Sequence, residues 1–273
     1  MISAGGVALA VQEAGGGVPV VLLHGLTATR RYVVMGSRAL ERSGHRVIAY
    51  DARGHGRSSP APTPTAYAYD ELAVDLEAVL DGLGIERAVL AGASMGAHTL
   101  LRFALRAPER TRGLVVITPA YGGEEHVGGE QAGRLARWDA LAEGLRSGGV
   151  DGFVAAYGTP PVAPAYRETV VKVIRQRLAA HEHPGAVADA LQVVPRSRPF
   201  GSIAELGQLD VPVAVVASGD DADPEHPYAV GQAYAAAIPG ATLVSDPPGA
   251  SPIAWQGSQL SRVIADVAAR AGG

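Results

Sequence analysis

The chain has 273 residues, of which 47% are hydrophobic, and its formal net charge at pH 7 is −4. This length and apolar content suffice for a substantial buried core, as one large domain or as a domain with an insertion. The basic residues are scattered arginines with the single lysine Lys172, which excludes a basic stripe for nucleic acid, and the absence of cysteine excludes disulfides, thiolate catalysis and cysteine-based metal sites.

The first half of the chain alternates short apolar runs with longer helical patterns. Val7–Val11 predicts an early edge strand. Four more runs, each rich in β-branched residues or leucine, predict strands buried on both faces of a parallel sheet: Val18–Leu23, Arg46–Tyr50, Ala88–Ala91 and Leu114–Thr118. Between them, Asp70–Leu83 predicts a helix with Asp70 as its N-cap and Gly84 as its terminator.

The middle of the chain, about residues 120–207, lacks strand-like runs. It begins with a glycine-rich stretch and then predicts helices around Gln131–Ser147 and Ala165–Ala180, with proline-rich joints. The alternation returns with strands at Val211–Ser218 and Ala241–Ser245 and a final helix. We therefore predict an α/β fold: residues 1–119 and 208–273 form a mostly parallel, doubly wound sheet with helices on both faces, and residues 120–207 insert as a helical cap.

A serine stands at the most informative turn of the chain. Gly92-Ala93-Ser94-Met95-Gly96 directly follows a predicted strand and directly precedes a helical pattern, Ala97–Ala107. A tight strand-to-helix turn of this kind strains the serine backbone and presents its hydroxyl at a helix N-terminus. There the helix dipole and the N–H of Met95 stabilise an oxyanion, so Ser94 is the predicted nucleophile.

Two further motifs carry a family resemblance. With His24-Gly25 after an early strand and Asp51-Ala52-Arg53-Gly54-His55-Gly56-Arg57-Ser58 after the next, the chain resembles the α/β-hydrolase superfamily over most of its length. The resemblance implies the α/β-hydrolase fold and an oxyanion hole made by the N–H groups of Leu26 and Met95, with Thr27 lining the pocket. It also implies that His24, His55 and Asp51 shape loops. We expect His98, one helical turn past Ser94, to pack beneath the turn.

The loop after Val211–Ser218 is rich in acidic residues. Relatives carry their catalytic acid here, typically as G-x-x-D-x-x-x-P, and Asp223 with Pro227 matches the second half of that pattern. The spacing from Gly219 is one residue too long, so Asp221 remains a competitor for the acid.

The histidine that should complete the triad is absent from its expected place. In this fold it follows the acid along the chain, after the last strand, but that loop carries Ser251 about where the histidine belongs, and no histidine follows His226. Three explanations compete. His226, or less favourably His126, acts as a relocated base; the protein is a non-hydrolytic member that performs cyclisation, C–C bond or lyase chemistry in secondary metabolism; or it is a pseudoenzyme that binds a ligand.

The first of these explanations leads to our predicted function. We predict a cofactor-free serine hydrolase of a small ester, lactone or thioester, with Ser94, Asp223 and His226 as catalytic residues. Ser251 and Trp255 are expected near the substrate, under a cap whose apolar wall draws on four aromatic residues: Trp138, Phe153, Tyr157 and Tyr166. We expect neither a metal nor a nucleic-acid or membrane partner, and leave homo-oligomerisation open. The N-terminus lacks signal-peptide features, which predicts a cytoplasmic location.

Overall fold

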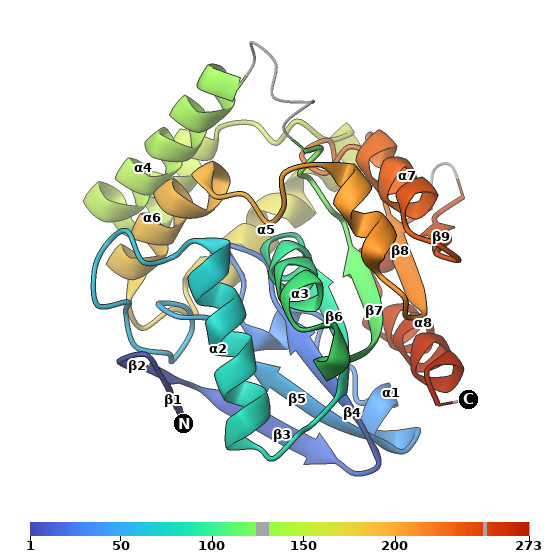
Figure 1. The fold of residues 1–273 in the computed structure, drawn as a ribbon. Helices are drawn as coiled ribbons and strands as arrows, with labels where there is room; N and C mark the ends of the chain where they lie inside the picture. The colour runs from blue at the N-terminus through green and yellow to red at the C-terminus, as the bar shows by residue number, and fades with distance from the viewer. Residues whose placement is uncertain (124–130, 248–249, 273) are drawn as a thin grey trace.

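A seven-stranded sheet forms the centre of the computed structural model, which describes residues 1–123, 131–247 and 250–272. Its order is β3-β5-β4-β6-β7-β8-β9, and only β3 runs antiparallel to its neighbour (Figure 1). The bounds are β3 Val11–Gly15, β4 Val18–Leu23, β5 His45–Tyr50, β6 Ala88–Ala93, β7 Thr111–Ile117, β8 Val213–Ala217 and β9 Thr242–Ser245. The predicted mostly parallel sheet is confirmed. It could be predicted because strands buried on both faces need continuous apolar runs, which the sequence contains.

The predicted single strand at Val7–Val11 is wrong. It divides into β2 (Val7–Leu9), which forms a small hairpin with β1 (Ile2–Ala4), and β3 of the main sheet. The division falls at Ala10, whose N–H donates to the Ser58 hydroxyl at 2.9 Å and whose carbonyl accepts from the Asp51 N–H at 3.0 Å. These bonds to a distant loop turn the chain from one sheet to the other.

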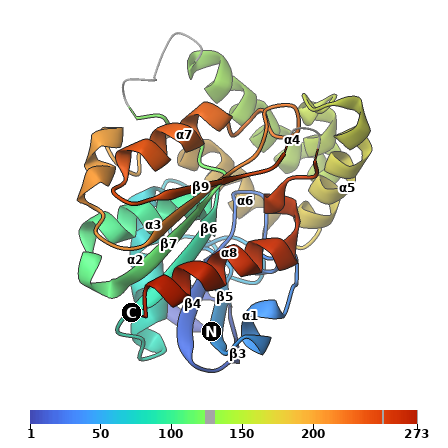
Figure 2. The same cartoon turned by 90° about the vertical axis from the view of Figure 1, so that its right-hand side faces the viewer.

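Helices cover both faces of the sheet. The helices α2 (Tyr69–Gly82), α3 (Met95–Arg106) and α7 (Tyr228–Ala237) bury their apolar residues against one face. The short α1 (Ala39–Arg42) and α8 (Gly257–Arg270) pack on the other, and Figure 2 shows them on the opposite side from α2 and α3. This is the doubly wound arrangement that the sequence predicted.

Helix α2 begins one residue earlier than predicted, and Asp70 is not its N-cap. Ala68 occupies that position without a side-chain hydrogen bond, and the Tyr69 N–H donates to the Ser197 hydroxyl at 2.9 Å. The Asp70 carboxylate instead pairs with Arg102 on α3 at 2.6 Å. A contact between two helices thus replaces the local cap.

Between β7 and β8 the described chain contains helices and no strand. These are α4 (Gln131–Tyr157), α5 (Arg167–Leu178) and α6 (Pro184–Val193), with 3₁₀ turns η4 (Pro164–Tyr166), η5 (Val194–Arg196) and η6 (Ile203–Gln208). The first part of α4 ends close to the predicted Ser147, because Gly149, with φ of 58°, is not helical, and a second helical stretch then continues to Tyr157. Figure 1 shows α4, α5 and α6 gathered at one end of the sheet.

One apolar cluster joins these helices to the sheet. It contains Leu141, Phe153 and Leu191 from the inserted helices together with Leu26 and Met95, which follow β4 and β6. The helices between β7 and β8 therefore cover the carboxyl ends of the parallel strands, where open α/β sheets bind ligands. No helix of the described ranges is long and apolar enough to cross a membrane.

Candidate active site

Ser94 occupies a strained turn between β6 and α3. Its φ of 50° and ψ of −110° are rare for a residue with a side chain, and its N–H donates to the Ile117 carbonyl of β7 at 2.9 Å. The two glycines of the motif are required sterically. A Cβ on Gly92 would lie 2.3 Å from the Gly96 carbonyl oxygen, and a Cβ on Gly96 would lie 2.2 Å from that of Leu23. The sequence motif thus specifies a turn that only glycine permits at two of its five positions.

His226 reaches the serine from the loop after β8. Its Nε2 lies 2.8 Å from Ser94 Oγ, and its Nδ1 lies 2.7 Å from Asp223 Oδ1. With Nδ1–H donating to the carboxylate, Nε2 is left to accept the hydrogen of the serine hydroxyl. The side chains of His226 and Asp223 are only 20% and 17% exposed, so the line of hydrogen bonds is largely shielded from solvent. The structure therefore brings together all three residues that the sequence nominated as catalytic.

Asp221, the competing acid, does not contact the imidazole. Its side chain is exposed and folds back over Gly219, while its carbonyl accepts a hydrogen bond from Ala163 N–H at 2.8 Å. The alternative base His126 lies outside the described residues. Of the candidates that can be compared, His226 contacts Ser94, and Asp223 is the acid that contacts His226.

Tight turns and contacts with the inserted helices shape the acid loop. The N–H of His226 donates to the Asp223 carbonyl at 3.1 Å, and the N–H of Asp223 donates to that of Gly219 at the same distance. Arg137 of α4 forms an ion pair with Glu225 at 2.8 Å. Together with the Ala163–Asp221 bond, this ion pair holds the loop against the inserted helices from both sides.

The charges of this loop raise the pKa of His226. Burial disfavours the imidazolium, but the negative charge and hydrogen bond of Asp223, with a further contribution from Glu225, outweigh it. Tyr157 lies nearby, where burial and then the charge of Glu225 raise the pKa of its phenol to about 12. An imidazolium formed when His226 takes a proton is thus stabilised by its surroundings.

The two predicted oxyanion donors follow neighbouring strands: Leu26 lies after β4 and Met95 after β6. Within the described residues, neither the Leu26 N–H nor the Met95 N–H donates to another protein group. His24 fixes the loop after β4, because its Nδ1–H donates to the Gly25 carbonyl at 2.8 Å and its Nε2 accepts from Ala52 N–H at 2.9 Å. His55 Nε2 lies 2.7 Å from the Leu26 carbonyl oxygen. These contacts support the structural roles that the sequence assigned to both histidines.

Two more polar side chains hold loops. The buried Asp51 carboxylate accepts from the N–H groups of Arg30 and Arg57, at 2.8 and 3.1 Å. His98 lies beneath the turn: its Nε2 accepts from Tyr121 N–H at 3.2 Å, and burial, with the nearby His226, lowers its pKa to about 3. A histidine that stays neutral in this position suits packing, as predicted.

The residues predicted to contact the substrate differ in their surroundings. Thr27 follows Leu26, and its carbonyl lies 3.1 Å from His181 Nε2. Ser251 is exposed and makes no described contact with Ser94 or His226. Trp255 packs against α8 and meets the Tyr166 ring edge-on, with 5.5 Å between ring centroids. Ser251 therefore does not take the place of the absent histidine.

The other expected wall residues take part in packing. Phe153 is buried, and its ring stacks on that of Tyr157 with 6.2 Å between centroids. Trp138 and Tyr157 pack at the edge of the apolar cluster of the inserted helices. Their role as pocket wall stays a prediction.

Sequence reasoning missed two residues near the end of α5. His181 Nδ1 accepts from Gly56 N–H at 2.8 Å and so joins this segment to the loop after β5. Arg177, one turn earlier, lies over the Tyr32 ring with its Cζ 5.3 Å from the ring centroid. Because α5 ends at Leu178 and His181 lies in the turn beyond it, no pattern in the sequence pointed to either residue.

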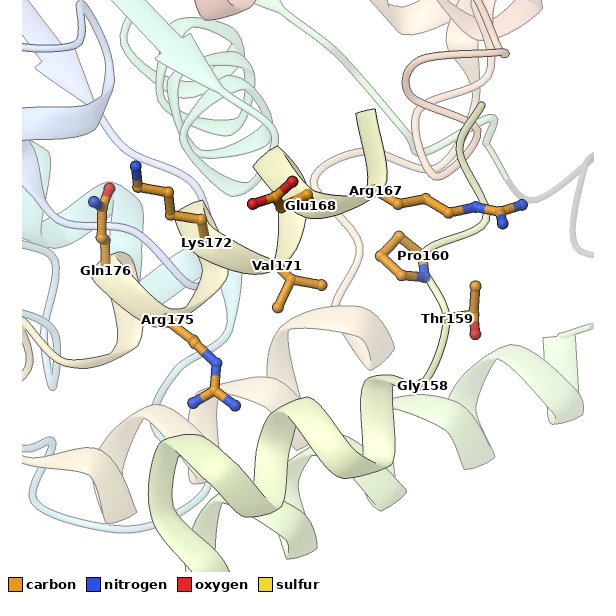
Figure 3. Close-up of a pocket in the computed structure, with 9 residues that line it drawn as sticks. All are labelled: Gly158, Thr159, Pro160, Arg167, Glu168, Val171, Lys172, Arg175 and Gln176. Carbon is orange, nitrogen blue, oxygen red and sulfur yellow. The ribbon is translucent and has the colours of Figure 1, made fainter. Parts of the chain in front are cut away.

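A large hollow lies away from Ser94. It is an open depression of about 700 Å³ between α5 and the end of α4 (Figure 3), lined by residues that include Pro160, Val171 and Lys172. A second cavity beneath the turn, next to Met95 and Gly96, measures about 10 Å³. That volume is about enough for one water molecule, so it serves packing rather than ligand binding.

Comparisons with known proteins agree with the fold. The model of the alpha/beta hydrolase fold family matches residues 18–148, a range that includes Ser94 but not Asp223 or His226. A putative carbamate hydrolase, RutD, of Variovorax paradoxus is 31% identical over 207 residues, which cover 76% of this chain and 75% of that protein.

Other similarities cover different lengths. A putative non-heme haloperoxidase of Mycobacterium phage D29 is 38% identical over 127 residues, or 46% of this chain and 45% of that protein. The chain spans less than half the length of the first curated relatives that it matches. A solved thermophilic esterase from Thermogutta terrifontis superposes with a TM-score of 0.80 over 100% of this chain and 98% of that one, at 24% identity. At that identity the likeness concerns the fold.

Proposed function

Because the chain belongs to the α/β-hydrolase fold family, we propose that it is a cofactor-free serine hydrolase of small esters, lactones or thioesters. Ser94 is the nucleophile, His226 its general base and Asp223 the acid that orients the base. The hydrolase names among the relatives agree with an enzyme of this family.

One observation carries the proposal. His226 lies 2.8 Å from Ser94 Oγ through one ring nitrogen and 2.7 Å from Asp223 through the other. A serine hydroxyl is a weak nucleophile unless a base takes its proton, and a base works best when a third group fixes its tautomer. The relocated histidine supplies both conditions, although it precedes the last strand of the sheet instead of following it.

The reaction follows from these positions. Ser94 Oγ attacks the carbonyl carbon while its proton passes to His226 Nε2, and Asp223 stabilises the imidazolium. The N–H groups of Leu26 and Met95 bind the oxyanion of the tetrahedral intermediate. His226 then protonates the leaving alcohol or thiol, which departs from an acyl-serine. A water molecule, deprotonated by His226, releases the acid and restores the serine.

The non-hydrolytic and ligand-binding alternatives depended on a serine without a base. The contact between His226 and Ser94 removes their premise, so hydrolysis is favoured over cyclisation, lyase chemistry or simple binding. No feature of the described residues favours either alternative.

The test is the hydrolysis of p-nitrophenyl butyrate by the wild type and three variants. We expect Ser94→Ala and His226→Gln each to lower kcat by at least about 10³-fold, as when one member of a triad is removed. His183→Gln is the matched control, because that histidine is partly exposed and makes no described side-chain hydrogen bond. Equal rates in the wild type and Ser94→Ala would refute the proposal, and an active His226→Gln would refute the relocated base.

A further inference from the structure

Arg177 lies where the inserted helix α5 meets the loop after β4, which carries Leu26, one of the two predicted oxyanion donors. It stands in the last turn of α5, and its guanidinium covers the ring of Tyr32, with Cζ 5.3 Å from the ring centroid. Tyr32 belongs to η1 (Arg30–Tyr32), which follows Leu26 by a few residues. His181, one turn beyond Arg177, lies 3.1 Å from the Thr27 carbonyl oxygen and fixes this end of α5 against the same loop.

The guanidinium of Arg177 lacks an anionic partner within the described part of the chain. Its Nε is buried and no described group accepts its hydrogen, and it takes part in no ion pair with a described residue. The arginines of α4 and α5 that do form ion pairs use carboxylates that solvent reaches, such as Asp151, the partner of Arg175, whose side chain is 85% exposed. A buried, charged donor without an acceptor is costly, and such groups in a native structure usually await a ligand or solvent.

The positive charge of Arg177 contributes to the pKa values of active-site histidines. Burial is the largest influence on the pKa of both His24 and His226, and the positive charge of Arg177 adds to its lowering effect at each. Asp223 acts in return on Arg177, where burial lowers the pKa and the carboxylate opposes that change. Arginine remains charged at neutral pH in any case. The guanidinium therefore acts on the triad through its charge, without being bonded to any member of it.

We propose that Arg177 binds a carboxylate of the substrate, so that the hydrolase acts by preference on esters or lactones that carry a negative charge. The inference rests on the proposed function, because it names the substrate class of the same site. A planar guanidinium with free N–H donors matches a carboxylate in a two-point hydrogen-bonded pair. The stacking on Tyr32 holds the guanidinium in one orientation, which lowers the entropic cost of binding.

The principal experiment compares charged and neutral esters of similar shape. One pair places the charge on the acyl side: mono-p-nitrophenyl glutarate against p-nitrophenyl pentanoate. A second pair places it on the leaving group: 4-(butyryloxy)benzoate against phenyl butyrate. For at least one pair, we expect Arg177→Met to lower the charged-to-neutral ratio of kcat/KM by about tenfold to a hundredfold, the value of a hydrogen bond to a charged group. Most of the change should appear in KM.

Arg175→Met is the matched control, because Arg175 lies on the same helix with its side chain about half exposed. It should leave both ratios unchanged. A ratio within twofold of wild type for both pairs in Arg177→Met would overturn the inference while leaving the hydrolase intact. If Arg177 merely tuned His226, the variant would shift the pH profile for charged and neutral esters alike, and this result would also overturn it.

A binding measurement tests the carboxylate site independently of turnover. Monoethyl glutarate should raise the melting temperature of Ser94→Ala but not that of the double variant Ser94→Ala/Arg177→Met. If no ester is hydrolysed, the proposed function fails and this measurement still tests the carboxylate site. An equal shift in both proteins, or none in either, would refute it.

Discussion

A methyl group added to Gly96 should separate the two halves of the oxyanion hole. The new Cβ would lie 2.2 Å from the carbonyl oxygen of Leu23, the last residue of β4, and 2.8 Å from Leu23 Cβ. Ordinary contact begins near 3.4 Å, so the first turn of α3 and the end of β4 must part by about 1.2 Å. Met95 belongs to the first turn of α3, and Leu26 follows β4. Their two N–H groups would therefore move apart by a similar distance.

The size of the effect follows from hydrogen-bond geometry. Oxyanion donors work at about 2.7–3.1 Å, and the loss of one donor lowers kcat by about 10²–10³-fold. We expect a loss of that order for Gly96→Ala in p-nitrophenyl butyrate hydrolysis. Overpacking should also lower the free energy of unfolding by about 1–3 kcal/mol, partly offset by the better helix propensity of alanine. Urea denaturation measures this change in the free energy of unfolding, and the folded fraction is used to correct the rate.

Gly133→Ala provides the matched control. Gly133 lies in α4 with nothing within 4 Å of an added Cβ, so the change should leave activity intact and raise stability by a fraction of a kcal/mol. A folded Gly96→Ala protein with activity within threefold of wild type would refute the reasoning. It would mean that β4 and α3 can separate without disturbing the groups that stabilise the transition state.

Three further predictions concern the charges around the site. His226 must be neutral to accept the serine proton, and its pKa is raised. The acid limb of the pH profile of kcat/KM should therefore lie above the ordinary histidine pKa of 6.5. Asp223→Asn should move this limb to lower pH and also lower the rate. Asp75→Asn should lower the free energy of unfolding by about 3–5 kcal/mol, because it leaves the buried Arg53, held at 2.7 and 2.8 Å, without its counter-charge. Arg137→Gln should lower kcat/KM severalfold with less than about 1 kcal/mol of lost stability, since it frees the acid loop by removing an exposed ion pair.

The first two of these have matched controls. Glu225→Gln should shift the acid limb in the same direction as Asp223→Asn but less, because the contribution of Glu225 is smaller. Asp139→Asn breaks the half-exposed pair with Arg196 and should cost less than about 1 kcal/mol in the same urea titration. An unchanged acid limb in Asp223→Asn, a stable Asp75→Asn protein, or an Arg137→Gln enzyme of wild-type activity would each contradict the corresponding argument.

The sequence predicted the elements whose causes are local. Val18–Leu23 coincides with β4 because a run of buried β-branched residues and leucine has few alternatives to a central strand. The turn around Ser94 was predicted because its steric demands fall on glycines within five residues. Asp70 failed as a cap for the opposite reason. Its carboxylate was free to pair with Arg102, which is remote in sequence but adjacent in the fold.

The residues of the active site differ in the same way: some could be predicted from local sequence and others could not. His226 was nominated by elimination, but whether its ring reached Ser94 depended on bonds from the inserted helices, such as Ala163 to Asp221, that no local pattern records. Arg177 was not nominated at all. Its significance lies in the buried Nε without an acceptor and in the stacking on Tyr32, and both are properties of the folded chain only.

The sheet order explains why a histidine on the acid loop suffices. The nucleophile follows β6, and the strands beyond it run β7, β8, β9. A base placed after β8 is one strand spacing, about 4.8 Å, closer to Ser94 than one placed after β9. Acid and base then share one turn, in which the Asp223 carbonyl accepts from the His226 N–H, so their relative orientation is set locally. In the proposed triad the segment after β9 needs no catalytic residue, and there the Trp255 ring meets that of Tyr166 from the inserted segment edge-on.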